Sequence, residues 1–358
     1  MKGRVLVAGF ATRHVVCSAV RAGYEVYAID HFCDQDLCAA ATAHSSFEEL
    51  ADLPELIAGI CADHSIDWFV GTSGAEMLTV PVRRAGTTPK ISARFLDKEH
   101  IQEFFEENGI PAPCRACGTY PAMLKPRHGA GGWRNRLVHS AADVTAWEEE
   151  WPEVPSILQE VIDGVPASVS CIADGHRAVA IAVNDQILRG GDGNRAFGFS
   201  GSITPSDHPA AEAMMAIAEQ AVALSGCVGS VGVDFMVGED GVRAIEINPR
   251  FQGTLDTVEA ATGLNLFDLH IEACTGILPE RRPAAQRACA RAILFADRDL
   301  TVERDLMAYA DCCADIPWPG TSIEEGSAVV SVYGRGADRA AACSELDRNI
   351  TRLRQYIS

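Results

Sequence analysis

Two carboxylates and a side-chain amide are spaced so that one face of a β-hairpin could hold a hard cation. Two strand-like runs, residues 231–237 and 242–247, flank a Gly-Glu-Asp-Gly turn. Because side chains alternate along a strand, Glu246 and Asn248 would face one side, and Asp234 can face it from the neighbouring strand. Carboxylate and amide oxygens are ligands suited to Mg²⁺ shared with substrate phosphates. A solvated hairpin face is the alternative interpretation of the same pattern.

The apolar residues of the same two runs favour a structured site over a solvated hairpin. We expect the opposite face to be buried and to be covered by Val233, Phe235, Ile245 and Ile247. The run ends abruptly in Asn-Pro-Arg, which places Arg250 just beyond the proposed cation ligands. Residues 244–250 are therefore the most informative segment of the chain.

A lysine followed by a glycine-rich loop is the second feature that could do chemistry. Lys125 ends an apolar run and precedes Pro-Arg-His-Gly-Ala-Gly-Gly, which contains Gly129, Gly131 and Gly132. Bare backbone N–H groups can close over phosphates where side chains are absent, and lysine supplies positive charge. The loop is not a Walker motif because Gly-Lys-Ser/Thr is missing. An ordinary turn remains the alternative.

Two weaker features complete the set. Residues 158–164 read as a strand that enters a turn, so Glu160 and the following backbone could meet an adenine edge, and a carboxylate could meet a ribose. Lys98 follows Asp97 at a predicted helix start, where a lysine is often only a surface charge.

The elements that must position these residues begin with a βαβ unit. Residues 4–8 read as a buried strand, a helix follows to a stop at Gly23, and residues 25–29 read as a second strand. The intervening turn lacks the second and third glycines of a dinucleotide-binding fingerprint, which argues against nicotinamide or flavin binding. Further along, we predict antiparallel strands within residues 156–185 and a helix over residues 209–225.

Length and composition restrict the function classes. A chain of 358 residues exceeds the roughly 250–300 residues at which one core stops growing, so we expect several lobes. The net charge of −19 argues against nucleic-acid and membrane-surface partners. No apolar run is long enough to span a bilayer, the short N-terminal run reads as a buried strand, and the thirteen cysteines are scattered, so we expect a cytoplasmic protein. Cys114 and Cys117 have metal-ligand spacing but no second pair, which favours ordinary thiols over a zinc site.

Taken together, these features resemble the ATP-grasp superfamily. That family has a lysine before its central lobe, a second lysine leading into a glycine loop, a hinge strand with Glu, and an acidic residue followed by Glu-x-Asn-Pro-Arg, and all occur here in that order. Within the superfamily the chain looks most like predicted carboligases related to biotin carboxylase and carbamoyl phosphate synthase. The resemblance covers nearly the whole chain, and the Glu-Ile-Asn-Pro-Arg segment is its most specific part.

The resemblance implies an α/β fold made of α+β lobes, an ATP-grasp fold with a Rossmann-like N-terminal lobe and a small β-rich C-terminal lobe. The implied lobes are a pre-ATP-grasp lobe, two ATP-grasp subdomains and the C-terminal lobe, at residues 1–90, 91–155, 156–282 and 283–358.

The resemblance also implies a role for each candidate residue. Phosphate contacts would come from Lys98, Lys125 and the loop from Gly129 to Gly132, including Gly131. Adenine would meet Glu160, Val161 and Ile162, while Asp234, Glu246 and Asn248 would bind Mg²⁺, or Mn²⁺ in its place. Arg250, together with Lys125, would act on the transferred phosphate. Several relatives carry a ribose-binding acid where this chain has Ala167-Ser168, and Asp163 is the candidate substitute.

The implied activity is that of an ADP-forming carbon–nitrogen ligase acting on small molecules, in small-molecule or cofactor biosynthesis. It would activate a carboxylate as an acyl phosphate with ATP and pass it to an amine, and the resemblance leaves a homodimer open. Arg189, Arg195 and a glycine-rich loop at residues 198–202 are candidates for substrate recognition. A bicarbonate-activating carboxylase and an inactive nucleotide-binding regulatory protein remain the alternatives.

Overall fold

The computed structural model describes residues 2–129, 131–191 and 193–357. At residue 357 it describes the backbone alone. Its N-terminal lobe is a parallel sheet in the order β3-β2-β1-β4. Residues 5–8 of β1 are fully buried, as their unbroken apolar character predicts. The predicted βαβ start is confirmed. The elements of this lobe are β1 (Arg4–Gly9), α1 (Arg13–Arg21), β2 (Glu25–Asp30), α2 (Gln35–Ala40), β3 (Ala43–Ser46), η1 (Leu50–Asp52), α3 (Leu53–Asp63) and β4 (Trp68–Gly71).

A small antiparallel sheet in the order β6-β5-β7 follows after two helices. The Asp97 carboxylate accepts a hydrogen bond from the Glu99 amide at the start of α5, so the predicted helix start is confirmed with its cap. The elements are α4 (Pro89–Phe95), α5 (Lys98–Glu107), β5 (Ala122–Pro126), β6 (Arg136–Val138), α6 (Ala141–Glu150) and β7 (Ser156–Glu160).

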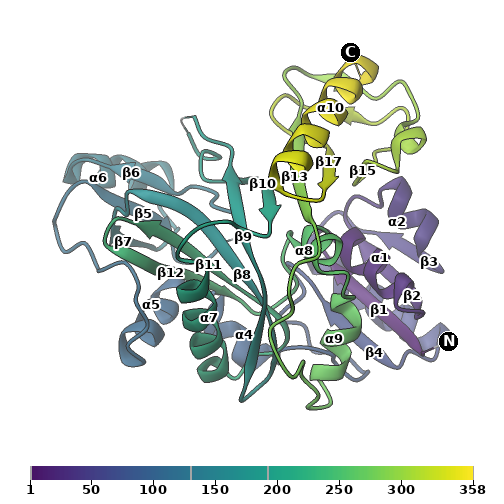
Figure 1. Cartoon of the computed structure of the whole chain (residues 1–358), viewed down its shortest axis with the longest axis horizontal. Coiled ribbons are helices and arrows are strands. Elements are labelled where there is room, and N and C mark those ends of the chain that lie inside the picture. The colour runs from purple at the N-terminus through teal and green to yellow at the C-terminus, as the bar shows by residue number, and fades with distance from the viewer. Residues whose placement is uncertain (1, 130, 192, 358) are drawn as a thin grey trace.

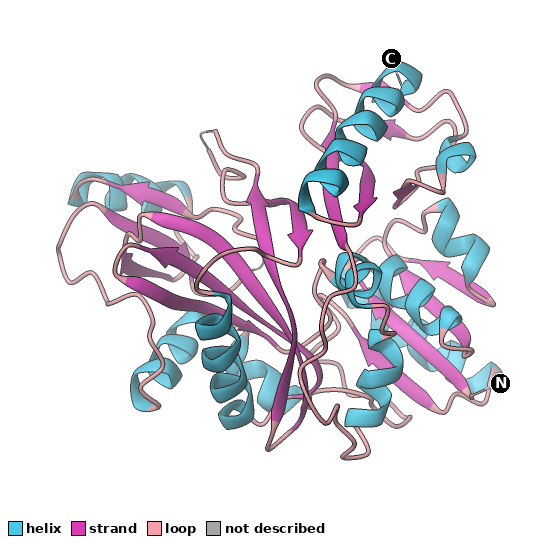
Figure 2. Cartoon of the chain, in the orientation of Figure 1, coloured by secondary structure: helices cyan, strands magenta, loops and turns pink. Residues whose placement is uncertain are grey.

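The large sheet has the order β12-β11-β8-β9-β10-β13-β17-β15, and all of its pairings are antiparallel. It runs from the predicted second ATP-grasp subdomain into the C-terminal segment, because β10 pairs with β13 across residue 283 (Figure 2). Its strands and the adjoining helices are β8 (Gly164–Asp174), β9 (Ala178–Leu188), β10 (Phe199–Thr204), α7 (Ala211–Ser225), β11 (Val228–Gly238), β12 (Gly241–Asn248), α8 (Leu255–Thr262), α9 (Leu266–Ala273), β13 (Ala288–Phe295), β15 (Cys313–Ala314) and β17 (Ala328–Gly336).

The C-terminal segment contains a short sheet and closes with a long helix. α10 (Arg339–Ile357) packs on β13 and β17 through Ala342, Leu346 and Leu353. The remaining elements are β14 (Leu300–Thr301), η2 (Leu306–Tyr309) and β16 (Ser322–Ile323). Figure 1 shows this segment, in yellow and pale green, beside α2 of the N-terminal lobe.

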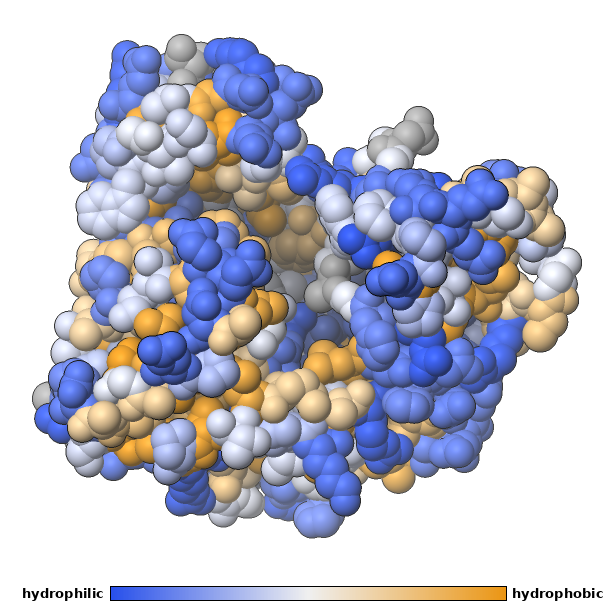
Figure 3. Space-filling model, turned by 180° about the vertical axis from the view of Figure 1, so that it is seen from behind, coloured by the Kyte–Doolittle hydropathy of each residue, from blue (hydrophilic) through white to orange (hydrophobic). Residues whose placement is uncertain are grey.

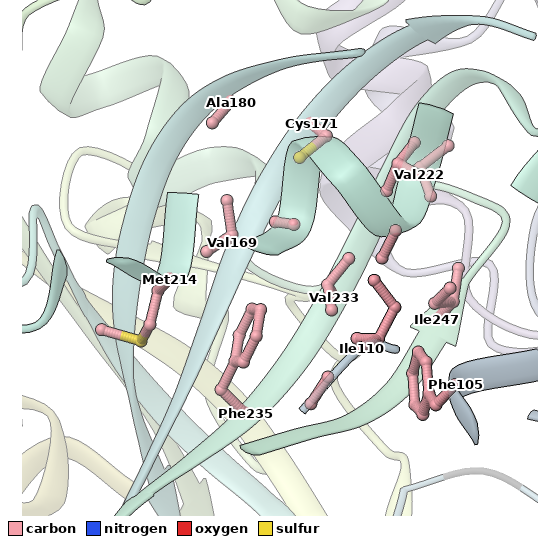
Figure 4. Close-up of a cluster of buried hydrophobic side chains, with 14 of the residues drawn as sticks. Phe105, Ile110, Val169, Cys171, Ala180, Met214, Val222, Val233, Phe235 and Ile247 are labelled. Carbon is pink, nitrogen blue, oxygen red and sulfur yellow. The ribbon is translucent and has the colours of Figure 1, made fainter. Parts of the chain in front are cut away.

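One face of the large sheet is sealed by α7 and by α5 with its following turn. Val233, Phe235 and Ile247 project from this face and are buried, and Met214 and Val222 of α7 belong to the same cluster (Figure 4). Because one face is buried in this way, the polar residues that alternate with it must occupy the other face. The packing of α7 therefore fixes where the candidate site lies.

The predicted antiparallel strands within residues 156–185 are confirmed, with β7 paired to β5 in the small sheet and β8 paired to β9 in the large one. One expectation about local structure is wrong. Most of the glycine-rich stretch 198–202 is not a loop, because residues 199–204 form β10. A Cβ atom at Gly201 would lie 2.2 Å from the Arg291 carbonyl oxygen, so the glycine permits close strand pairing there.

In the part of the chain that the structure describes, we find no helix with the length and apolar character needed to cross a membrane.

Candidate active site

A cavity of about 340 Å³ lies between the small sheet and the large sheet. Figure 3 shows that the molecule is deeply hollowed where its lobes meet. The cavity brings together residues that the sequence analysis predicted from four separate segments: Lys125, Gly131, Gly132, Glu160, Val161, Ile162, Asp234 and Glu246. Its other lining residues are mainly apolar and include Met123, Leu137, Leu188, Phe199, Met236 and Ile245. A pocket with mainly apolar walls and a few charged and polar groups suits a flat ring attached to a charged tail.

The predicted carboxylate pair is formed. Asp234 of β11 lies directly opposite Glu246 of β12 in the strand register, so both side chains share one face. Asn248 donates from Nδ2 to Asp234 Oδ2 at 2.9 Å, and Gln186 donates from Nε2 to Asp234 Oδ1 at 2.9 Å. Burial raises the pKa of the Asp234 carboxyl to about 7, and the neighbouring Glu246 carboxylate adds to the rise. The two carboxylates thus share one strand face with the Asn248 amide beside Asp234, and carboxylate oxygens are donors of the type that suits a hard divalent cation.

Gln186 was missed by the sequence analysis. It projects from β9, on the far side of β8 from Asp234, and it reaches Asp234 diagonally, because the β8 residue opposite Asp234, Ser168, lies opposite Asn184 of β9. The strand order β11-β8-β9 that makes this contact could not be read from local periodicity.

Ile245 was expected on the buried face, and this expectation is wrong. A β-bulge between Asp234 and Phe235 pairs Phe235 with Ala244, so Ile245 is the extra residue of β12. Ile245 is half-buried and lines the cavity, whereas Ala244 and Ile247 are buried in the core. The bulge thereby adds an apolar wall directly beside Glu246.

Lys125 points into the cavity from the end region of β5 and is only 8% exposed. Burial lowers the pKa of its ammonium to about 8, the Glu246 carboxylate opposes this, and nearby Lys98 adds to it. Lys98 donates from Nζ to the Gly129 carbonyl oxygen at 2.9 Å and is not among the residues that line the cavity. The two lysines therefore differ: Lys125 faces the cavity, and Lys98 holds the glycine loop in place.

The glycine loop abuts the connection between β9 and β10. The Arg134 amide donates to the Asn194 carbonyl at 2.9 Å, and a Cβ atom at Gly132 would lie 2.3 Å from the Phe197 carbonyl oxygen. Gly129, Gly131 and Gly132 all have positive φ angles, which glycine adopts without strain. Ala130, which the predicted loop includes, lies outside the described residues.

Replacing Gly132 by alanine is expected to destabilise the chain more than replacing Gly131. Each variant forces a positive φ on alanine, at a cost of about 1–3 kcal/mol, but only the Gly132 variant also collides with backbone. No described atom lies within 4 Å of a Cβ at Gly131, so Gly131→Ala is the matched control. Thermal melts of both variants would check this, and equal melting temperatures would contradict it.

The predicted hinge is partly assembled. Glu160, Val161 and Ile162 line the cavity, and the Glu160 carboxylate accepts a hydrogen bond from the Cys114 amide at 2.9 Å. Asp163 is exposed and does not line the cavity, so the structure does not bring it to the other site residues.

Cys114 and Cys117 are exposed free thiols, and no cluster of three or more His, Cys, Asp or Glu side chains suited to a metal occurs within residues 2–129, 131–191 and 193–357.

Arg250 forms an ion pair that the sequence analysis missed. Its Nε lies 3.0 Å from Oε1 of Glu76, and both side chains are largely buried. Glu76 also accepts a hydrogen bond from the Gly74 amide, so it is fixed in the loop after β4. The Arg250 guanidinium is 3.4 Å from Asn248 Oδ1 and does not line the cavity. Arg250 thus connects the N-terminal lobe to the strand that carries Glu246 and Asn248.

Replacing either partner of this pair by glutamine is expected to lower the free energy of unfolding by about 2–4 kcal/mol, because the other charge stays buried without its partner. The double variant Glu76→Gln with Arg250→Gln should lose less than the sum of the two single losses. Urea unfolding of all four proteins would measure the coupling. Strictly additive losses would show that the pair does not join the lobes energetically.

The basic residues proposed for substrate recognition are engaged elsewhere. The Arg189 guanidinium lies over the Phe295 ring at 3.9 Å, and Arg195 donates to the Gly326 carbonyl at 3.1 Å. Ser202 is fully buried in β10. These contacts fasten the β9–β10 connection to the C-terminal segment.

Comparison with known proteins identifies the central region. Residues 95–254 match the family model described as ATP-grasp domain. This region is an ATP-grasp domain. It contains every candidate residue discussed above except Glu76, and the cavity lies within it.

Similar proteins agree with this assignment over a wider part of the chain. A carbamoyl phosphate synthase large chain from Ralstonia nicotianae is 27% identical over 208 residues, which cover 51% of this chain but only 19% of that relative. A biotin carboxylase structure from Campylobacter jejuni has a TM-score of 0.80 at 14% identity and covers 98% of this chain and 91% of its own. A phosphoribosylamine–glycine ligase structure from Thermotoga maritima has a TM-score of 0.75 at 15% identity, covering 97% and 96%. At such identities the structures show the shared fold, so the expected ATP-grasp fold is confirmed.

Proposed function

We propose that this chain is a Mg²⁺- and ATP-dependent ligase that activates a carboxylate as an acyl phosphate for attack by an amine. The observation that carries the proposal is that Lys125, Asp234 and Glu246 line one cavity whose other lining residues are mainly apolar. The ATP-grasp domain match and the family's ligase members support it.

The apolar part of the cavity wall suits adenine. Met123, Leu137, Met236 and Ile245 offer flat or flexible apolar surfaces, and the Glu160 to Ile162 strand end offers backbone groups. Asp234, Glu246 and Asn248 would hold Mg²⁺, which would screen the phosphates of the bound nucleotide. Mn²⁺ has the same preference for oxygen donors.

The chain's own residues mainly position the substrates and neutralise the charge of the phosphates. Lys125, whose side chain is largely buried, would offset phosphate charge more strongly than an exposed lysine. Gly131 leaves room for a phosphate oxygen beside its amide, whereas Gly132 permits the close approach of the Phe197 backbone. Arg250 is a positioning residue in this scheme, because its ion pair with Glu76 holds the strand end that carries Asn248.

The proposed reaction has two steps. A carboxylate oxygen attacks the γ-phosphorus, the bond to the β-phosphate oxygen breaks, and ADP leaves. The amine nitrogen then attacks the acyl carbon, the carbon–oxygen bond to phosphate breaks, and the nitrogen loses a proton as the amide forms. No side-chain nucleophile is required.

A screen of ADP release across pairs of carboxylates and amines tests the proposal. We expect release to need both substrates and Mg²⁺, and to be lost in Glu246→Gln. ADP release with bicarbonate alone would instead support a carboxylase, the activity named for the Campylobacter jejuni structure. Nucleotide binding without ADP release from any pair would favour a regulatory protein.

A further inference from the structure

Three side-chain amides surround the Asp234 carboxylate on the polar face of the large sheet. Gln186 donates from Nε2 to Asp234 Oδ1 at 2.9 Å, and Gln252 donates from Nε2 to the same oxygen at 3.5 Å. Asn248 donates from Nδ2 to the other oxygen, Oδ2, at 2.9 Å. In contrast, no hydrogen bond or ion pair among the described residues reaches the carboxylate of Glu246, which lies opposite Asp234 in the strand register. The two carboxylates of the candidate cation site are therefore not equivalent.

The orientation of these amides follows from what surrounds them. An ionised carboxylate only accepts hydrogen bonds, so each amide must turn its nitrogen toward Asp234. Two of the three amides are also held at their oxygen. Gln252 Oε1 accepts from the Ser170 hydroxyl at 3.1 Å, and Asn248 Oδ1 faces the Arg250 guanidinium at 3.4 Å. Their donors are thus directed at Asp234 from both ends of each amide group.

The sheet beneath Gln252 is shaped to hold it. A Cβ atom at Gly232 would lie 1.8 Å from the Gln252 side chain, so glycine alone leaves room for the amide there. Ser170, which lies opposite Gly232 in β8, accepts a hydrogen bond from the fully buried Asn184 at 3.3 Å. Asn184 in turn accepts one from the buried Thr204 hydroxyl at 2.6 Å. The donors around Asp234 therefore rest on an ordered, buried polar layer.

These contacts limit what Asp234 can offer to a cation. An ionised carboxylate has about four acceptor positions, two on each oxygen. Gln186 and Gln252 occupy those of Oδ1, and Asn248 occupies one of those on Oδ2. Asp234 is therefore left with a single oxygen, Oδ2, for a cation, and it cannot bind one through both oxygens while Gln186 is in place.

This restriction distinguishes between divalent cations. Mg²⁺ demands a nearly octahedral set of six oxygens, keeps several waters, and uses one or two carboxylates beside substrate phosphates. Ca²⁺ is larger, takes six to eight oxygens, and readily accepts both oxygens of one carboxylate. A carboxylate that is restricted to one oxygen therefore suits Mg²⁺ and withholds a ligand that Ca²⁺ could use.

We propose that Gln186 is a specificity-determining residue that makes the cation site select Mg²⁺ over Ca²⁺, by holding Oδ1 of Asp234 away from the cation. The inference rests on the proposed function, which supplies the nucleotide and the cation site. Gln186 acts through Asp234 and is a positioning residue. Gln252 acts in the same sense but more weakly, because its contact is longer.

The variant Gln186→Met tests this, because methionine matches the length of glutamine but has no hydrogen-bond donor. Thermal melts of the full chain with a non-hydrolysable ATP analogue would be recorded across a titration of Mg²⁺ and across one of Ca²⁺. The concentration that gives half of the maximal shift measures the affinity for each cation. We expect the wild type to respond at a lower concentration of Mg²⁺ than of Ca²⁺.

In Gln186→Met the ratio of Ca²⁺ affinity to Mg²⁺ affinity should rise about tenfold. Loss of a residue that orients a metal ligand commonly weakens metal binding by about 10- to 100-fold, and here Ca²⁺ would recover part of this loss through Oδ1. Gln186 also lines the cavity, so its loss can change nucleotide binding, but that effect is common to both titrations and cancels in the ratio. A merely structural role would weaken both cations equally, and an unchanged ratio would overturn the proposal.

Two further variants make the test independent of one protein. Gln252→Met should raise the ratio in the same direction but less, and a larger rise than in Gln186→Met would overturn the assignment to Gln186. If Gln186→Met does not fold, an unchanged ratio in Gln252→Met would overturn the proposal instead. Gln220→Met, the same substitution at an exposed position of α7 beneath the opposite face of the sheet, is the matched control and should leave the ratio unchanged.

The wild-type titrations separate this inference from the proposed function. If neither cation raises the stability of the wild type with the ATP analogue, the proposed function itself fails. If Mg²⁺ raises it and the ratio is the same in the wild type and in Gln186→Met, only the role of Gln186 is wrong. A wild type that binds Ca²⁺ as tightly as Mg²⁺ would likewise overturn the inference alone.

Discussion

Glu246→Gln is expected to lower the rate of ADP release by about 100- to 1000-fold, the effect of removing one charged group that acts on the transferring phosphate. Glu246 faces Asp234 across the strand pair and lines the same cavity, so its loss would leave one carboxylate for the cation. The substitution keeps the size of the side chain and its place beside Ile245. The fold should therefore be unaffected.

Two measurements would distinguish loss of the cation from general damage. A titration with Mg²⁺ in the presence of a non-hydrolysable ATP analogue should show a clear increase in thermal stability for the wild type and little for Glu246→Gln. Glu239→Gln is the matched control, because Glu239 is exposed at the turn of the same hairpin. A variant that releases ADP at the wild-type rate would show that the proposed cation site is wrong.

Lys125→Met is expected to weaken binding of the ATP analogue by about 10- to 100-fold, since an ion pair closed off from water is screened less than an exposed one. Burial already lowers the pKa of this ammonium to about 8. The nucleotide-free protein therefore gains little from the charge, and its melting temperature should not fall in the variant. The expected loss is one of binding rather than of stability.

The other lysines provide graded controls for this prediction. Lys98→Met should weaken binding less, because Lys98 contacts the Gly129 carbonyl and reaches the nucleotide only through the loop. Lys90→Met, at an exposed position at the start of α4, should have no effect. Equal losses in Lys98→Met and Lys125→Met would show that the two lysines share one role, although only Lys125 lines the cavity.

Much of the site could be predicted from the sequence because residues that are near one another in the chain position it. The Asp234–Glu246 pair depends on a hairpin whose short turn brings neighbouring strands together, and this register is a local property. The cap at Asp97, the N-terminal βαβ unit and the exit at Asn248 are local in the same sense. The sequence by itself therefore determined the ATP-grasp resemblance and the hairpin that carries Asp234 and Glu246.

Only the tertiary structure decided which distant segments meet. The bulge that turns Ile245 into the cavity is one residue long, and periodicity predicts a regular strand there. Gln186 contacts Asp234 across β8, the strand that lies between their own strands. Glu76 meets Arg250 from another lobe, 174 positions earlier in the chain. Arg189 and Arg195, expected at a substrate, instead fasten a connection to the C-terminal segment. Strand order and the docking of lobes arise from contacts between remote residues, which spacing along the chain does not encode.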